Sequence, residues 1–192
     1  MAHLEIDIGH MPTSTIHGEH YFQVVVDRFS RMIWVDLMKK QSEAFDHFQT
    51  LYQRLRIEKP HLRVNKLIGD GFYDSKMFQQ HAQQEGYELQ IKSAYSDKAW
   101  LAERAIQSLR RGTMPTLATA GMNLRWWGYA MHDVVVVLRQ SHTQLLPPNT
   151  TRQTVWEEEN YSTTQTTTTS RRSQRPPWGV SGVGEKLCGE QK

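Results

Sequence analysis

The chain has 192 residues, of which 38% are hydrophobic and 22% charged, with a formal net charge of +3 and a pI near 9.0. This length and hydrophobic content predict one globular domain plus an appendage. The single cysteine, Cys188, excludes a disulfide framework or a multi-cysteine zinc site within the chain and fits a reducing compartment. The small basic excess is compatible with an anionic partner but does not establish one.

Neither a membrane span nor a secretory signal is predicted. No stretch approaches the roughly 18 to 20 consecutive apolar residues that cross a bilayer. The first residues include Glu5 and Asp7 and lack the charge and apolar layout of a signal peptide. We therefore expect a soluble intracellular protein with no membrane partner.

Three strand-like segments open the chain. Residues 4–8 form a short apolar run, and residues 21–27 and 31–37 are rich in β-branched and aromatic side chains. The latter two are separated by only three residues, which predicts a hairpin. An antiparallel meander of three strands is the simplest pairing.

Helices and strands alternate after the meander. Residues 42–57 carry apolar side chains at helical spacing, and Ser42 is placed to cap this helix. A strand over residues 64–68 follows, then a helix over 75–85 that stops at Gly86, and a strand over 87–91. Two further helices are predicted over about 98–111 and about 125–140. Strand–helix–strand order implies right-handed parallel crossovers. The sequence thus predicts a three-layer α/β fold with a mixed five-stranded sheet flanked by helices.

The composition changes beyond Trp156. Six threonines lie between residues 163 and 169, and an arginine-containing and then glycine-rich end follows. Such a segment cannot build a core. We predict a core domain over residues 1–156 and a disordered Thr/Arg/Gly-rich tail over residues 157–192.

Three acidic residues stand in different kinds of local sequence. Asp7 lies in the first apolar strand, Asp70 follows the fourth, and Glu103 lies in the helix near residues 98–111. Carboxylates at the ends of buried strands are costly unless a cation meets them. The first and fourth strands can be neighbours in a mixed sheet, with the helix packed across them. The sequence therefore predicts that the three carboxylates converge on a metal site.

Carboxylate oxygens suit Mg²⁺, which is a hard cation. Two divalent ions held by carboxylates can activate a nucleophile on one side of a reacting centre and stabilise the leaving oxygen on the other. Without a cation, two carboxylates about 4 Å apart repel by about 4 kcal/mol at an effective dielectric near 20. The predicted cluster thus requires metal ions or protons.

Several motifs occur in a characteristic order. They are Asp7-x-Gly9-x-Met11-Pro12, Asp27-Arg28-Phe29-Ser30-Arg31, Ile68-Gly69-Asp70, Ala102-Glu103-Arg104, Trp126-Trp127-Gly128 and Leu138-Arg139-Gln140. Together they resemble the integrase catalytic core of copia-type LTR retrotransposons, a retroviral-type integrase. The resemblance implies a ribonuclease H-like fold and a polynucleotidyl transferase that processes element DNA and joins it to target DNA. Asp7, Asp70 and Glu103 fall on the family's catalytic, metal-binding positions, which implies Mg²⁺ or Mn²⁺ and two ions.

The resemblance also implies partners and a compartment. The implied partners are element DNA, target DNA and further copies of the chain in a homo-oligomer. The implied compartment is the nucleus, which the protein enters from a cytoplasmic particle. The alternative is a catalytically decayed or domesticated integrase fragment that retains the fold and nucleic-acid or partner binding. A cellular nuclease of the same fold is a third, weaker alternative.

Departures from the family pattern favour the decayed alternative. The spacing between Asp70 and Glu103 is slightly short, with Lys98-Ala99-Trp100-Leu101 where the family has a Gln-Asn-Gly loop. Gly71-Phe72 follows Asp70 in place of the family's Asn-Gly or Ser-Gly. The family's preceding zinc-binding module also has no counterpart in this sequence.

The helix that carries Glu103 has a polar and basic side. Glu103, Gln107 and Arg110 follow i, i+4, i+7 spacing, and Arg111 flanks them. We hypothesise that Gln107, Arg110 and Arg111 contact the DNA backbone, which would make binding salt-dependent. A solvated helix face is the competing interpretation.

Other conspicuous residues receive structural interpretations. Asp27 and Asp36 are interpreted as turn or capping residues, and Lys92 as a surface charge. Trp126 and Trp127 are interpreted as core and interface residues.

Overall fold

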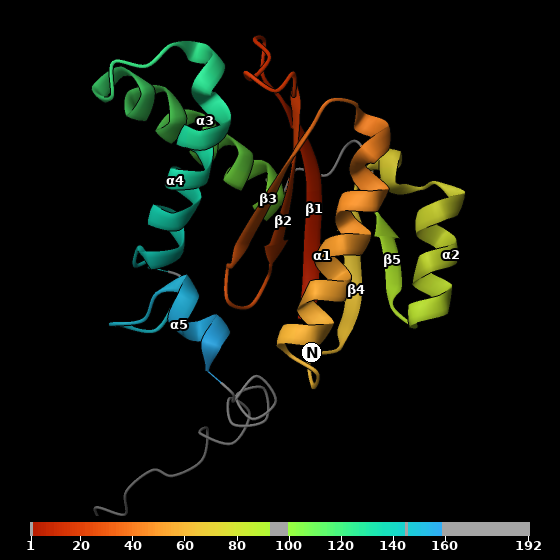
Figure 1. The fold of residues 1–192 in the computed structure, drawn as a ribbon. Helices are drawn as coiled ribbons and strands as arrows, with labels where there is room; N and C mark the ends of the chain where they lie inside the picture. Colours follow the sequence, from red (N-terminus) through yellow and green to blue (C-terminus); the bar gives the residue numbers. More distant parts are fainter. Residues whose placement is uncertain (1, 93–99, 145, 159–192) are drawn as a thin grey trace, which may run out of the picture. The chain divides into compact units, whose positions relative to one another are not determined.

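The computed structural model describes residues 2–92, 100–144 and 146–158 (Figure 1). The chain divides into two units, residues 1–161 and 162–192, and the description below concerns the first. Residues 98 and 99 of the unusual segment before Glu103 lie outside the described residues. So does the predicted tail, apart from residues 157 and 158.

A five-stranded mixed sheet forms the centre of the first unit, in the order β3-β2-β1-β4-β5. The strands are β1 (Ala2–His10), β2 (Tyr21–Asp27), β3 (Ile33–Met38), β4 (Val64–Gly69) and β5 (Glu88–Ile91). The β1–β2 and β2–β3 pairs are antiparallel, whereas the β1–β4 and β4–β5 pairs are parallel. The predicted meander, the parallel crossovers and the neighbouring first and fourth strands are confirmed.

Helices cover both faces of the sheet (Figure 1). The helices are α1 (Ala44–Glu58), α2 (Lys76–Glu85), α3 (Leu101–Thr119), α4 (Trp127–Gln140) and α5 (Arg152–Glu157). One apolar cluster joins the sheet to α1 and α2, and a second joins it to α3 and α4. The predicted three-layer α/β architecture is therefore confirmed. None of the helices in the described part of the chain combines the length and apolar character needed to cross a membrane.

Strand β2 shows how the sequence produces the two layers. Successive side chains of a strand point to opposite faces. Accordingly, Val25 packs in the cluster with α1 and α2, whereas Val24 and Val26 pack in the cluster with α3 and α4. Trp127 is completely buried in the latter, and its Nε1 donates to the carbonyl of Thr13 at 2.7 Å. The core interpretation of Trp127 is confirmed.

The start of α1 differs from the sequence prediction. Ser42 does not cap this helix, because residues Gln41–Glu43 form a separate 3-10 turn and α1 begins at Ala44. The turn is held by Glu43, whose Oε2 accepts a hydrogen bond from the Lys39 N–H at 3.0 Å. A local contact therefore delays the helix by two residues.

Helix α3 is longer than predicted. It continues past Arg111 to Thr119 and contains Pro115, which removes one backbone donor from the helix. The hydroxyls of Thr113 and Thr116 donate to the carbonyls of residues one turn earlier, at 2.7 and 2.9 Å. Packing against the sheet and α4 keeps the segment helical despite the proline, since Thr113 is completely buried.

Candidate active site

Strand β1 directs its acidic side chains toward one layer. Leu4 and Ile6 are completely buried in the cluster with α1 and α2. Because side chains alternate along a strand, Glu5 and Asp7 face the opposite layer, which contains α3. Asp7 is partly buried, and its Oδ1 accepts a hydrogen bond from the Ile8 N–H at 2.8 Å.

Asp70 comes directly after β4, beside β1. In the parallel β1–β4 pair Glu5 lies opposite Ile68, so the same register continued by two residues places Asp7 next to Asp70. The Asp70 Oδ1 accepts from the Phe72 N–H at 3.1 Å and caps the 3-10 turn Gly71–Tyr73. This cap fixes the backbone where the chain leaves the sheet.

Glu103 lies in the first turn of α3, and its charge acts on the Asp7 carboxylate. Burial is the main cause that raises the pKa of Asp7, and the carboxylates of Asp70 and Glu103 raise it further. The hydrogen bond from Ile8 and the charge of Lys92 oppose these effects. The end of β4 and the first turn of α3 therefore each bring a like charge to bear on the Asp7 carboxylate of β1.

The carboxylates are not preassembled around a metal position. Among residues 2–92, 100–144 and 146–158, no group of three or more His, Cys, Asp or Glu side chains is arranged to hold an ion. The metal-binding role of Asp7, Asp70 and Glu103 stays a prediction from the sequence.

Lys92 belongs to this acidic neighbourhood, contrary to its interpretation as a surface charge. Its backbone N–H donates to the Gly69 carbonyl at 2.8 Å, and its ammonium lies 3.9 Å from the centre of the Trp100 ring. Burial lowers the pKa of Lys92, while Asp7, followed by three further carboxylates, acts in the opposite direction. The strand order carries the missed signal, because residues that follow parallel neighbouring strands meet at the same edge of a sheet.

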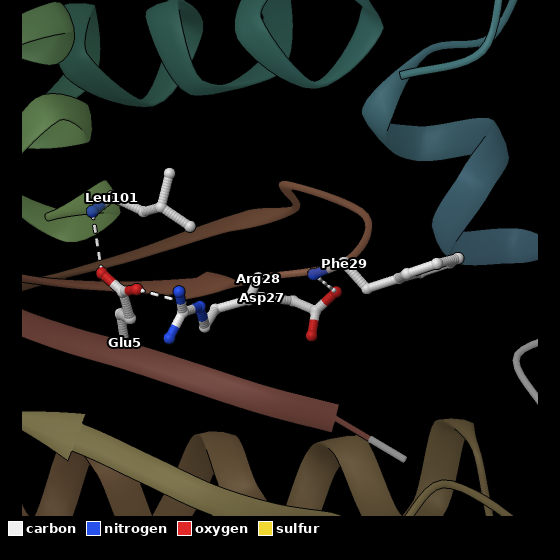
Figure 2. A network of polar contacts seen from close by, with 5 residues as sticks. All are labelled: Glu5, Asp27, Arg28, Phe29 and Leu101. Carbon is white, nitrogen blue, oxygen red and sulfur yellow. Dashed lines mark hydrogen bonds and ion pairs between the residues drawn. The ribbon is translucent and has the colours of Figure 1, made fainter. Parts of the chain in front are cut away.

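Glu5 fixes the start of α3 (Figure 2). Its side chain is 2% exposed, and its Oε2 accepts from the Leu101 N–H at 2.7 Å while its Oε1 lies 3.3 Å from the Arg28 Nε. The first N–H groups of a helix have no partner within the helix and carry its positive dipole end. Glu5 thus joins the strand of Asp7 to the helix of Glu103, a role that the sequence did not reveal.

Arg28 reaches Glu5 from a turn that is organised by Asp27. The Asp27 Oδ2 accepts from the Ser30 N–H at 2.7 Å, the Ser30 hydroxyl at 2.8 Å and the Phe29 N–H at 3.2 Å (Figure 2 shows the last contact). The interpretation of Asp27 as a turn residue is confirmed. The turn directs Arg28 toward Glu5 and Phe29 away from it.

Comparison with known sequences gives a remote relative. No family model matches the chain. It is 23% identical, over 137 residues, to the retrovirus-related Pol polyprotein from transposon TNT 1-94 of Nicotiana tabacum. The match covers 69% of the chain and 10% of the polyprotein, so the chain spans about a tenth of this relative's length.

Solved structures share the fold. The HTLV-2 integrase catalytic core domain in complex with magnesium, in its trimeric form, has a TM-score of 0.58 and 16% identity, covering 79% of this chain and 93% of that one. Its dimeric form has a TM-score of 0.57 and 17% identity, covering 78% and 92%. The fold is that of an integrase catalytic core. A chain of the simian T-cell lymphotropic virus intasome in complex with PP2A regulatory subunit B56 gamma has a TM-score of 0.64 and 16% identity, with 95% and 59% covered.

The sequence motifs and the fold now agree. The chain resembles a retrotransposon integrase core in its sequence, through the Pol polyprotein, and has the ribonuclease H-like α/β fold of retroviral integrase cores. In this integrase-like core, Asp7, Asp70 and Glu103 occupy β1, the end of β4 and the first turn of α3.

The predicted DNA-contacting residues lie along α3 of the integrase-like core. Gln107, Arg110 and Arg111 are all exposed. Arg110 is held against β1, because its Nη2 donates to the His10 carbonyl at 2.7 Å and its guanidinium lies 6.0 Å from the centre of the Phe22 ring. Contact of these residues with DNA stays a prediction.

Proposed function

We propose that the chain is the catalytic core of a retrotransposon integrase and transfers polynucleotides, by 3′ processing and strand transfer of element DNA into target DNA. The observation that supports this proposal is the raised pKa of Asp7, to which Asp70 and Glu103 contribute. Like-charged groups in a partly buried position require protons or cations. The Asp7 carboxylate therefore has an electrostatic need that a divalent cation meets.

The donor set fits the proposed metal. Asp7, Asp70 and Glu103 would hold Mg²⁺ or Mn²⁺, since carboxylate oxygens are the ligands that such hard cations prefer. The complex of the HTLV-2 integrase core with magnesium supports this assignment. When bound, two divalent ions would activate the attacking water or 3′-hydroxyl and stabilise the leaving oxygen.

The protein's contribution is to position these carboxylates. Asp7 comes from β1, the central strand of the sheet, and the hydrogen bond from the Phe72 N–H orients the Asp70 carboxylate. Glu5 holds the first residue of α3 two positions before Glu103.

We further propose that element and target DNA bind across this site, that the chain acts as a homo-oligomer, and that it acts in the nucleus. The exposed Gln107, Arg110 and Arg111 on α3 support the DNA proposal. The dimeric and trimeric forms of the HTLV-2 integrase core support the homo-oligomer.

A strand-transfer and disintegration assay tests the catalytic proposal. The chain and its Asp70→Asn variant are compared with Mg²⁺ and with Mn²⁺, and Asp74→Asn serves as the control because Asp74 is exposed. The expected result is product from the unchanged chain and the control but not from Asp70→Asn. Equal product from all three would show that the triad does not catalyse the reaction.

A decayed or domesticated integrase core is the second candidate. It is favoured by Lys92, whose ammonium neutralises part of the acidic cluster. It is also favoured by the lack of a ready-made metal group among the residues that the structure describes. If this alternative holds, the chain forms no strand-transfer product with Mg²⁺ or Mn²⁺, and neither ion raises its melting temperature. The chain still binds nucleic acid.

A further inference from the structure

A second charged site lies on another side of α3. A cavity of about 150 Å³ is lined by three arginines from three parts of the fold: Arg31 of the β2–β3 turn, Arg104 of α3 and Arg152 of α5. Ser108 and Thr143 also line the cavity, and aliphatic side chains complete the wall. The Ser108 hydroxyl donates to the Arg104 carbonyl at 2.9 Å. None of the lining residues within the described ranges is acidic.

Neighbouring arginines act on the guanidinium groups of Arg31 and Arg152. Burial is the main cause that lowers the pKa of Arg31, and Arg104 is among the neighbours that lower it further. Burial likewise lowers the pKa of Arg152, with Arg31 as the neighbouring charge that adds to the effect. These groups hold their protons at physiological pH nonetheless, because arginine does not deprotonate in proteins. The cavity is therefore a place of concentrated positive charge.

The nearest carboxylates have other partners. Glu5 and Asp27 oppose the lowering of the Arg31 pKa. However, Glu5 binds Leu101 and Arg28, and Asp27 binds the backbone of its own turn. Neither carboxylate lines the cavity. These two carboxylates offset part of the charge, and the three arginines that line the cavity outnumber them.

Arg31 has two unusual properties. Its Nε is buried and has no hydrogen-bond partner among the described residues. Its φ of 62° lies in the left-handed region, where glycine would be favoured. The turn nevertheless holds it there, since the Arg31 N–H donates to the Asp27 carbonyl at 3.0 Å. An arginine in a conformation that suits glycine indicates a role for its guanidinium, which reaches the cavity.

We propose that the arginine cavity binds a phosphate monoester group. Guanidinium groups match phosphate oxygens in geometry and can bind them through paired hydrogen bonds. A phosphate monoester carries two negative charges and a phosphodiester of a nucleic-acid backbone carries one. The charge of three arginines therefore suits the monoester better. The cavity is smaller than the roughly 300 to 1,000 Å³ of sites that enclose a drug-sized ligand, so it holds one group of a larger molecule. That molecule is either a free phosphate ester or a nucleic acid with a terminal phosphate.

The test measures the affinity for inorganic phosphate by calorimetry, without metal and at ionic strength balanced with chloride. In Arg31→Gly we expect affinity to fall about tenfold or more, which corresponds to about 1.4 kcal/mol. The urea midpoint of this variant should equal or exceed that of the unchanged chain, because glycine adopts this φ without strain. Arg104→Gln should weaken phosphate binding similarly. Arg63→Gln is the control, since Arg63 is exposed and does not line the cavity.

Three further ligands distinguish the source of the phosphate. Preference for a 5′-phosphorylated over a 5′-hydroxyl single strand would identify a nucleic-acid end. Equal competition by a nucleoside monophosphate and the phosphorylated strand would identify a free ester. No binding of phosphate beyond the chloride control, or unchanged affinity in Arg31→Gly, would overturn the proposal. Asp70→Asn should bind phosphate normally, so the proposed catalysis and this site can fail independently.

Discussion

The Glu5 carboxylate accepts a hydrogen bond at 2.7 Å from the backbone N–H of Leu101, 96 residues away in the sequence (Figure 2). The contact joins the centre of the sheet to the first residue of α3. Asp7 and Glu103 each lie two residues from one end of this contact. The relative position of two predicted catalytic carboxylates therefore depends on a buried side chain that binds no metal in our proposal.

Replacing Glu5 tests this contact. Glu5→Ala should lower the free energy of unfolding by about 1 to 3 kcal/mol, because the Leu101 N–H loses a buried acceptor. Glu5→Gln should cost less, since an amide oxygen still accepts that bond. The lost charge forms an ion pair with Arg28, whose side chain is 50% exposed, and such exposed pairs contribute little. Urea unfolding measures both changes.

The control for Glu5 is Glu88→Gln. Glu88 is exposed and pairs with Lys66 at 3.0 Å, so its replacement should leave stability nearly unchanged. Equal losses for Glu5→Ala and Glu5→Gln would contradict the proposed role of the hydrogen bond to Leu101.

The sequence predicted the fold better than the site. Alternating and continuous apolar runs identified all five strands, because burial of β-branched and aromatic side chains is a local signal. Gly86, with φ of 75°, ends α2 as expected. The roles of Glu5 and Lys92 were missed, because each depends on a partner far away in the chain. Arg31 was noted only within a motif, and its left-handed backbone has no signal in its residue type.

Asp7→Asn should change how stability depends on pH. The pKa of Asp7 is raised in the folded state above its ordinary value of 3.8, so the folded state binds its proton more readily than the unfolded state. Stability contributed by this group is therefore present at pH below 3.8 and is lost as the pH rises through the folded pKa. At neutral pH without metal, Asp7→Asn should be more stable than the unchanged chain.

The measurement is the urea midpoint as a function of pH, in a chelating buffer. The advantage of Asp7→Asn should shrink in acid, where Asp7 is protonated as well. Asp133→Asn is the control, because Asp133 is exposed on α4, and its curve should run parallel to that of the unchanged chain. If Asp7→Asn is no more stable than the unchanged chain at neutral pH, the charge of Asp7 does not destabilise the folded state as we expect.

Lys92→Gln tests the charge balance of the acidic site. The ammonium of Lys92 acts on Asp7, Glu103 and Asp70, so it competes electrostatically with a divalent cation. Its removal should tighten Mg²⁺ binding about three- to tenfold, which corresponds to about 0.7 to 1.4 kcal/mol. Calorimetry measures the affinity, and Lys66→Gln is the control, since Lys66 pairs with Glu88 instead. Weaker Mg²⁺ binding in Lys92→Gln would show that Lys92 supports the metal site.

Gly9→Ala tests the close approach of β1 to the core. A Cβ at this position would lie 2.1 Å from the Phe22 Cζ, and the Phe22 ring is buried against Trp127 with the ring centres 6.0 Å apart. We expect a loss of about 1 to 3 kcal/mol in the free energy of unfolding, because the ring must move within a packed core. Gly71→Ala, where no atom lies within 4 Å, should change little. In the double variant with Phe22→Leu the two effects should be less than additive, because the shorter side chain frees space. If the two losses simply add, the Phe22 ring does not limit the size of the side chain at position 9.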